Sequence, residues 1–171
     1  WKPTGEITLT YYPVTMSTDL TTGVVGSGSV GRYPDLPRYE KNTVVCLTAT
    51  PLPGWHFVNW SGDLTGSMNP TWIVMWAAKT VVANFAVDAY ETTVSAGLHG
   101  TIVPGTGSIP YHATRDYDVN PDAGYVVEAV TVDGVLQNDA AGRHSYVVTL
   151  KDVEGPHTLA ATFRRVPDSH A

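Results

Sequence analysis

The feature that most constrains this chain is an internal repeat, in which three short blocks of sequence recur in the same order in its two halves. The blocks read Gly-small-aliphatic, Pro-x-x-Gly-aromatic and a run that ends in Ala-x-Phe. They occupy residues 28–30, 51–55 and 79–85 in the first half and 100–102, 121–125 and 157–163 in the second. Because order counts for more than identity once repeats have diverged, the chain is predicted to contain two copies of one module.

Both copies have the pattern of strands joined by turns. Val, Thr, Tyr and Trp recur in short alternating runs, 16 glycines and 12 prolines interrupt them, and no window has a convincing helical period. In the Pro-x-x-Gly block, proline fixes the entry angle, glycine supplies a positive φ, and the following aromatic, Trp55 or Tyr125, is expected to enter the core. The chain is therefore predicted to be all-β, with this block as a tight turn between two strands.

Several of these blocks carry a family resemblance. Residues 43–51, 54–63, 69–70 and 79–85, together with Met75, resemble the divergent internalin-type B-repeat of bacterial surface proteins. Residues 95–102, 120–125, 132–134 and 157–159 are similar to another branch of the same group. The resemblance implies small β-grasp-like modules, extracellular and strung in tandem, that serve as spacers, adhesion elements or interaction modules. It carries over no catalytic residue and implies that the chain is not an enzyme.

On these grounds we predict two tandem β-grasp-like or β-sandwich modules preceded by an extra strand. The predicted boundaries are residues 1–17 for an N-terminal pairing strand, 18–86 and 87–165 for the two modules, and 166–171 for a C-terminal tail. All five tryptophans fall in the first half, whereas the excess of acidic residues falls entirely in the second. The two modules are therefore expected to have differently composed surfaces.

Charge and cysteine content exclude several classes of protein. The formal net charge is -6, whereas a surface that follows phosphates needs the opposite sign, so no nucleic-acid partner is expected. The single cysteine allows no internal disulfide and no multi-cysteine metal site. No apolar run approaches the roughly 18 residues of a membrane helix, so no membrane span is expected. A start at Trp1 in place of Met predicts a processed product or an excised fragment.

The most unusual pattern lies on the outward side of the first module's strands. A half-buried strand alternates apolar residues facing in with polar residues facing out, and the family pattern places Ile73 and Met75 inside. The outward positions then carry apolar side chains, namely Val44, Cys46, Trp72, Val74 and Trp76, with Val82 joining them from the closing strand. A monomer rarely exposes such a patch, so a partner or another part of the chain is expected to cover it.

Three explanations of this patch stay open. The patch contacts another subunit or a neighbouring domain, or the second module or the N-terminal segment folds over it. Alternatively it binds a glycan, with Trp72 and Trp76 stacking on sugar rings and Asn59 fixing hydroxyl groups. We favour association, which makes a homo-oligomer, a filament or adjacent domains of a larger surface protein the expected partner.

The segment before the repeat is a good strand with no counterpart in the second module. Ile7, Leu9 and Tyr11 alternate with polar or aromatic neighbours. Such a strand either adds to a sheet of its own molecule or is donated to the sheet edge of an adjacent subunit. Donation repeated head to tail generates an open filament. We predict strand donation, with these three residues as the donated strand.

The sequence shows no catalytic constellation. Ser61 lacks the glycine two positions earlier that a nucleophile elbow requires, because Asn59 stands there. Ser61 is therefore interpreted as a turn residue. No enzymatic activity and no cofactor are expected.

Two groups of possible metal ligands have equally simple structural explanations. His99 and His157 belong to the first and last strands of the second module, but two histidines without a fixed spacing are weak evidence for a metal. Asp116, Asp118 and Asp122 offer oxygen ligands of the type that calcium prefers, and alternation along a strand explains them equally well. No metal site is expected.

Taken together, the sequence predicts a non-enzymatic structural module that is secreted or lies on a prokaryotic cell surface. The favoured role is a self-associating subunit of a filament or stalk, assembled by strand addition and by packing of the apolar sheet face. The alternative is an adhesion module that binds a carbohydrate or a host surface.

Overall fold

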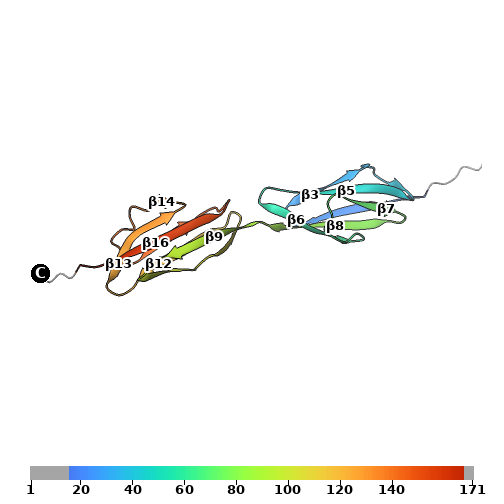
Figure 1. Cartoon of the computed structure of the whole chain (residues 1–171). Helices are drawn as coiled ribbons and strands as arrows, with labels where there is room; N and C mark the ends of the chain where they lie inside the picture. Colours follow the sequence, from blue (N-terminus) through green and yellow to red (C-terminus); the bar gives the residue numbers. More distant parts are fainter. Residues whose placement is uncertain (1–15, 168–171) are drawn as a thin grey trace, which may run out of the picture. The chain divides into compact units, whose positions relative to one another are not determined.

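The computed structural model describes residues 16–167, and every regular element in that range is a β-strand. The prediction of an all-β, sandwich-like chain is confirmed, and no helix occurs in the range described. The chain separates into two compact units, with the division between Ala86 and Val87 (Figure 1).

Unit 1 is a sandwich of two three-stranded sheets. Its strands are β1 (Ser17–Thr18), β2 (Leu20–Val25), β3 (Gly28–Tyr33), β4 (Tyr39–Glu40), β5 (Thr43–Pro51), β6 (Trp55–Gly62), β7 (Thr71–Met75) and β8 (Lys79–Val87). One sheet has the order β3-β5-β7 and is antiparallel throughout, and the other has the order β2-β8-β6 with β2 parallel to β8. Leu47 and Met75 from the first sheet and Val81 and Phe85 from the second share one buried core.

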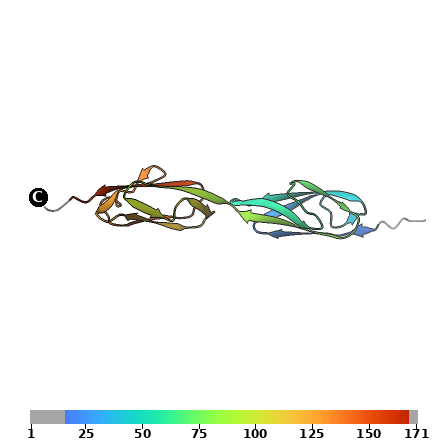
Figure 2. The ribbon, with the colours of Figure 1, turned by 60° about the horizontal axis from the view of Figure 1, so that its bottom comes forward.

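Unit 2 has the same two-layer arrangement, but its second sheet has five strands where the corresponding sheet of unit 1 has three, and unit 1 has a separate two-stranded sheet of β1 and β4. Its strands are β9 (Ala89–Ala96), β10 (Gly100–Val103), β11 (Gly107–Pro110), β12 (Arg115–Pro121), β13 (Tyr125–Val132), β14 (Val135–Leu136), β15 (Tyr146–Leu150) and β16 (His157–Arg165). The sheets have the orders β10-β12-β15 and β11-β9-β16-β13-β14, and β9 runs parallel to β16. Figure 2 shows the two layers of strands within each unit.

The two units share strand order, direction and register. β3-β5-β7 corresponds to β10-β12-β15, and β2-β8-β6 corresponds to β9-β16-β13. Gly28 stands opposite Pro51 in the first sheet of unit 1, and Gly100 stands opposite Pro121 in the first sheet of unit 2. The sequence blocks that repeat therefore occupy equivalent places in the fold.

A steric contact explains why the first and third blocks recur together. A Cβ atom on Gly28 would lie 2.5 Å from the ring of Phe85, and a Cβ atom on Gly100 would lie 2.4 Å from the ring of Phe163. Since only glycine lets the ring lie this close to the backbone, the glycine of one block and the phenylalanine of the other specify a single contact.

The second block forms the predicted tight turn in both units. The amide of Trp55 donates to the carbonyl of Leu52 at 3.0 Å, and the turn glycine, Gly54, has a φ of 75°. Unit 2 has the same hydrogen bond at Tyr125, again at 3.0 Å, and a turn glycine with positive φ. The prediction that the next aromatic enters the core is met in part by Trp55, which is partly buried and packs against the core. It is wrong for Tyr125, because that ring stacks instead on His99, with 4.0 Å between centroids.

An aspartate directly after β6 in unit 1 and after β13 in unit 2 bonds the start of the neighbouring strand in the sheet, β8 or β16, a feature that the sequence analysis missed. Asp63 accepts the amide hydrogen of Thr80 at 2.7 Å and donates its own amide to the Thr80 carbonyl at 2.8 Å. Asp133 makes the same two bonds with Thr158, at 2.7 and 2.8 Å. These aspartates fix the start of the closing strand, β8 or β16, beside the end of its sheet neighbour, β6 or β13.

Candidate interaction face

The outer face of the β3-β5-β7 sheet carries a row of large side chains. Tyr33 of β3 stands opposite Cys46 of β5, and Cys46 stands opposite Trp72 of β7. In the adjoining row Val44 stands opposite Val74. Because residues directly opposite each other point to the same side of a sheet, these five residues form one surface, which we call the aromatic face.

The side chains of the aromatic face are well exposed. The exposed fractions are 80% for Tyr33, 52% for Val44, 58% for Trp72 and 44% for Val74, and Cys46 is half-buried. The residues between them in β5 and β7, among them Val45, Leu47, Ile73 and Met75, are buried in the core. The sidedness predicted from the alternation is thus present in the fold, and Tyr33 is an addition that the sequence analysis did not single out.

Trp76 lies beyond the end of β7 and has a partner within unit 1. The ammonium of Lys79 lies 3.8 Å from the centroid of an indole ring of Trp76 and 3.5 Å from Oδ1 of Asp63. Lys79 is buried, so these two groups compensate its charge inside the protein. The backbone hydrogen bond from Thr80, aided by Lys79, holds the pKa of Asp63 below its usual value.

The structure does not bring Asn59 to the two tryptophans. Asn59 lies on β6 in the β2-β8-β6 sheet, where its side-chain oxygen accepts a hydrogen bond from Asn84 at 2.7 Å. Val82 is likewise in this sheet, on β8, so the expectation that it extends the apolar patch is wrong. Both misplacements arise because alternation gives the side of a strand but not the sheet to which the strand belongs.

Unit 2 presents a polar surface at the equivalent position. Asp116 and Thr149 occupy the cross-strand pair that corresponds to Cys46 and Trp72, and the Thr149 hydroxyl donates to Asp116 at 2.6 Å. Asp118, two residues further along β12, is exposed between Val103 and Val147, which are themselves exposed.

Alternation along β12 explains two of the three acidic residues considered for calcium, Asp116 and Asp118. Asp122 lies beyond the end of this strand, in the turn where its carbonyl accepts the amide hydrogen of Tyr125.

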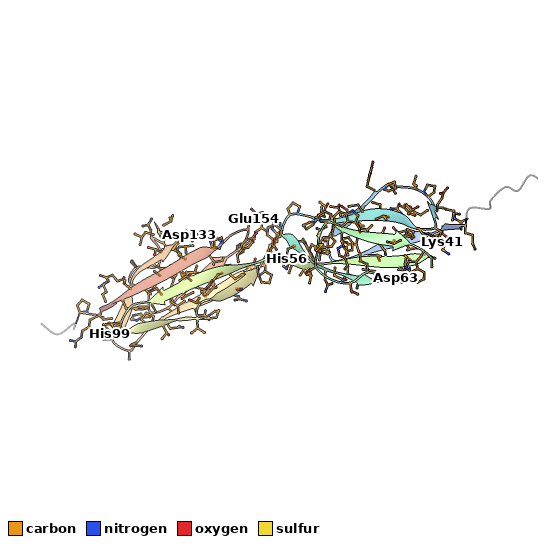
Figure 3. All side chains as sticks on the ribbon, turned by 45° about the vertical axis from the view of Figure 1, so that its right-hand side comes forward. Lys41, His56, Asp63, His99, Asp133 and Glu154 are labelled. Atoms are coloured by element: carbon orange, nitrogen blue, oxygen red, sulfur yellow. The ribbon has the colours of Figure 1, made fainter. Side chains whose placement is uncertain are left out.

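The two histidines considered as a metal pair lie apart within unit 2. His99 stacks on Tyr125, and His157 Nδ1 lies 2.7 Å from Oδ2 of Asp133. Figure 3 shows His99 and Asp133 in separate parts of the unit. The hydrogen bond with His157, followed by the one from the Thr158 amide, lowers the pKa of Asp133.

The interpretation of Ser61 as a turn residue is wrong, because Ser61 lies within strand β6. Its hydroxyl accepts a hydrogen bond from the side-chain amide of Asn84 at 3.0 Å. Ile7, Leu9 and Tyr11 of the predicted donated strand lie outside the described residues. β7 and β15 are candidate acceptors for an added strand. Each is the last strand of its sheet as described, since β7 pairs with β5 and β15 pairs with β12 along one side. A groove of about 390 Å³ runs beside β15 and is lined by residues 146–151 together with Val132 and Gln137.

Residues 18–89 match the family described as the divergent InlB B-repeat domain. This match confirms the resemblance drawn from the repeat blocks of the first half of the chain. No curated protein and no solved structure matches the chain. Within the described residues, no helix is long and apolar enough to cross a membrane.

Proposed function

Residues 18–89 form a divergent InlB B-repeat domain, a repeat module of bacterial surface proteins, and from this premise we propose that the chain is a non-enzymatic extracellular module that self-associates. The contact is the aromatic face of unit 1. A second copy of the chain is its partner, and the assembly is part of a surface filament or stalk.

The exposure of the aromatic face carries this proposal. Tyr33 and Trp72 flank Cys46 in one continuous row, and Val44 and Val74 extend the apolar surface along the strands. Monomeric proteins rarely leave contiguous apolar surface of this kind in water. Aromatic residues are also the side chains that contribute most to binding when a partner buries them.

The polar surface of unit 2 supports the same conclusion. The fold accepts Asp116 and Thr149 where unit 1 has Cys46 and Trp72. The apolar residues of unit 1 are therefore not required to build the sandwich. An acidic second unit also keeps neighbouring assemblies soluble through like-charge repulsion.

Strand addition is the second element of the proposal. The alternating segment with Ile7, Leu9 and Tyr11 has the pattern of a strand that adds to a sheet edge. The edges of β7 and β15 are suitable acceptors, and the groove beside β15 offers room for a chain. Addition to another copy extends the contact head to tail, whereas the aromatic face alone gives a closed pair.

Light scattering of the full chain over a range of concentrations tests the association. Trp72→Thr copies the residue of the equivalent position in unit 2, so it removes apolar area while the fold tolerates it. Loss of a tryptophan hot spot costs about 2 kcal/mol or more, which weakens the dimer about 30-fold or more. Leu98→Thr is the matched control, because Leu98 is an exposed apolar residue of unit 2.

The two elements of assembly separate by deletion. Removal of residues 1–15 is expected to end growth beyond closed pairs, whereas Trp72→Thr ends pairing through the face. A wild-type chain that stays monomeric at its highest soluble concentration contradicts self-association. Equal oligomerisation by the Trp72→Thr and Leu98→Thr variants excludes the aromatic face.

Carbohydrate binding is the second candidate, favoured by the exposed rings of Tyr33 and Trp72 on one sheet face. Aromatic rings in such a row stack on sugar rings. This role predicts retention of the wild-type chain on an immobilised polysaccharide, loss of retention in Trp72→Thr, and an unchanged mass for both. The mass measurement therefore distinguishes the two candidates.

A further inference from the structure

Three potential metal ligands meet on two loops of unit 2. His112 lies in the turn between β11 and β12, and Asp152 and Glu154 lie in the loop between β15 and β16. One ligand atom from each residue lies within 4.8 Å of the other two. His112 Nδ1 contacts Oδ1 of Asp152 directly and lies 3.8 Å from Oε1 of Glu154.

The backbone holds the two loops together at this point. The amide of His112 donates to the carbonyl of Val153 at 2.8 Å, and the amide of Val153 donates to the carbonyl of Ala113 at 3.2 Å. Val153 is fully buried between the two carboxylate residues. The side chain of Val153 thus anchors the loop in the core, while Asp152 and Glu154 on either side of it are exposed next to the imidazole.

The ring of His112 is also supported by a neighbouring aromatic. The centroid of Tyr111 lies 3.8 Å from that of His112. The ion pairs described for Asp152 and Glu154 are both with His112, and within the described residues no lysine or arginine forms an ion pair with either. The two carboxylates are therefore available to a cation.

We propose that His112, Asp152 and Glu154 form a surface site for a divalent transition metal of the zinc class. Imidazole nitrogen favours Zn²⁺ and its transition-metal neighbours, whereas Ca²⁺ and Mg²⁺ prefer oxygen ligands alone. Three protein ligands leave a fourth tetrahedral position for water. The ion replaces the direct hydrogen bond between His112 and Asp152 and ties the two loops through metal bonds.

The observed spacing suits this role after small movements. Zinc bonds of about 2.0–2.2 Å at tetrahedral angles place neighbouring ligand atoms roughly 3.4 Å apart. The separation of 3.8 Å between His112 and Glu154 is close to this value. The sequence analysis did not consider these residues as metal ligands, because His112 and Asp152 are 40 positions apart and no short motif links them.

Calorimetric titration of the untagged, chelator-treated full chain with Zn²⁺ tests the site. One equivalent is expected to bind, and thermal unfolding followed by circular dichroism is expected to shift upward with Zn²⁺. His112→Asn and Glu154→Gln are the test variants, and both are expected to lose binding and the thermal shift. Asparagine suits position 112 because His112 has a φ of 59°, which asparagine tolerates better than most residues.

His144→Asn is the matched control, since His144 is an exposed histidine of the same unit. It is expected to bind Zn²⁺ as the wild type does. The proposal is overturned if the wild-type chain gives no saturable heat with Zn²⁺. It is equally overturned if His112→Asn binds Zn²⁺ unchanged, or if Ca²⁺ binds the wild type as tightly as Zn²⁺ does. Unchanged circular dichroism of the metal-free variants shows that a loss of binding is not a loss of fold.

Discussion

The contact between Gly28 and Phe85 gives the sharpest test of how the repeat specifies the fold. A Cβ atom at position 28 would lie 2.5 Å from Cζ and 2.6 Å from Cε2 of Phe85, about 1 Å inside the usual separation of carbon atoms. Phe85 is buried and packs edge-on against Phe57, with 5.9 Å between the ring centroids. The ring is therefore held in place and cannot turn away without disturbing the core.

Gly28→Ala is expected to destabilise unit 1 by about 1–3 kcal/mol, the usual cost of overpacking a core. For a domain of this size the midpoint of thermal unfolding falls by about 4 to 24 °C. Gly28 is not among the glycines with positive φ, so the substitution measures steric conflict and not backbone strain. Gly31→Ala is the matched control on the same strand, because the nearest atoms to its added Cβ are 3.8 and 4.0 Å away.

Tryptophan fluorescence is the appropriate assay, since all five tryptophans lie in residues 1–86 and the signal reports unit 1 alone. The smaller side chain in Phe85→Leu is expected to relieve the clash. The Gly28→Ala/Phe85→Leu double variant is then more stable than the sum of the single effects predicts, by about 1 kcal/mol. Strict additivity, or a Gly28→Ala variant within about 0.5 kcal/mol of wild type, refutes the steric explanation.

Two other predictions concern backbone groups that side chains satisfy. The side chain of Asn69 accepts a hydrogen bond from the Ala49 amide at 2.9 Å and donates one to the Ala49 carbonyl at 2.7 Å. Asn69→Ala is therefore expected to lower the free energy of unfolding of unit 1, measured in urea, by about 1–2 kcal/mol. No change in this free energy shows that water replaces both bonds. Asp133 has a lowered pKa because His157 and the Thr158 amide hydrogen-bond its carboxylate. The stability that this carboxylate contributes is therefore fully present at pH values above the ordinary aspartate pKa of about 3.9. It is lost as the pH falls through the lower pKa of Asp133 in the folded protein. Asp133→Asn is expected to weaken the dependence of unit 2 stability on acidic pH, as measured by amide hydrogen exchange. If the variant and the wild type depend on pH identically, Asp133 is not the group responsible.

Local patterns in the sequence were sufficient to predict the class of fold and the sides of its strands. Spacing of turn residues predicted the hydrogen-bonded turns at Trp55 and Tyr125, and period-two alternation correctly separated Val45 from Val44. These features depend on neighbours within a few positions along the chain. They follow from strand geometry and turn conformation alone.

Features that depend on long-range pairing were not predictable in this way. Asn59 was grouped with Trp72 because nothing in the sequence states that β6 and β7 belong to different sheets. Alternation from Gly28 places Tyr33 on the solvent side of the sheet. The sequence analysis missed it because the preceding residues on that side are small, so the pattern of a strand is weak there. The aspartate after β6 or β13, such as Asp63, was missed because its role depends on which strand lies beside it in the sheet, and the sequence does not state this pairing.

The comparison of the two units indicates which residues serve the fold and which serve a partner. Both units have a glycine against the ring of a phenylalanine, and both have an aspartate that accepts a hydrogen bond from a backbone amide. These contacts involve the backbone, so they are the same wherever the fold is the same. The outer face of the three-stranded sheet obeys no such constraint, since it carries Trp72 in one unit and Thr149 in the other. We infer that the side chains on this face depend on the solvent or partner that contacts the face, and not on the packing of the unit. On this argument the aromatic face of unit 1 and the face of unit 2 that carries Asp116 and Thr149 have different surroundings. Exchange of Trp72 and Thr149 between the units is therefore expected to move the site of association with the tryptophan while both sandwiches stay folded.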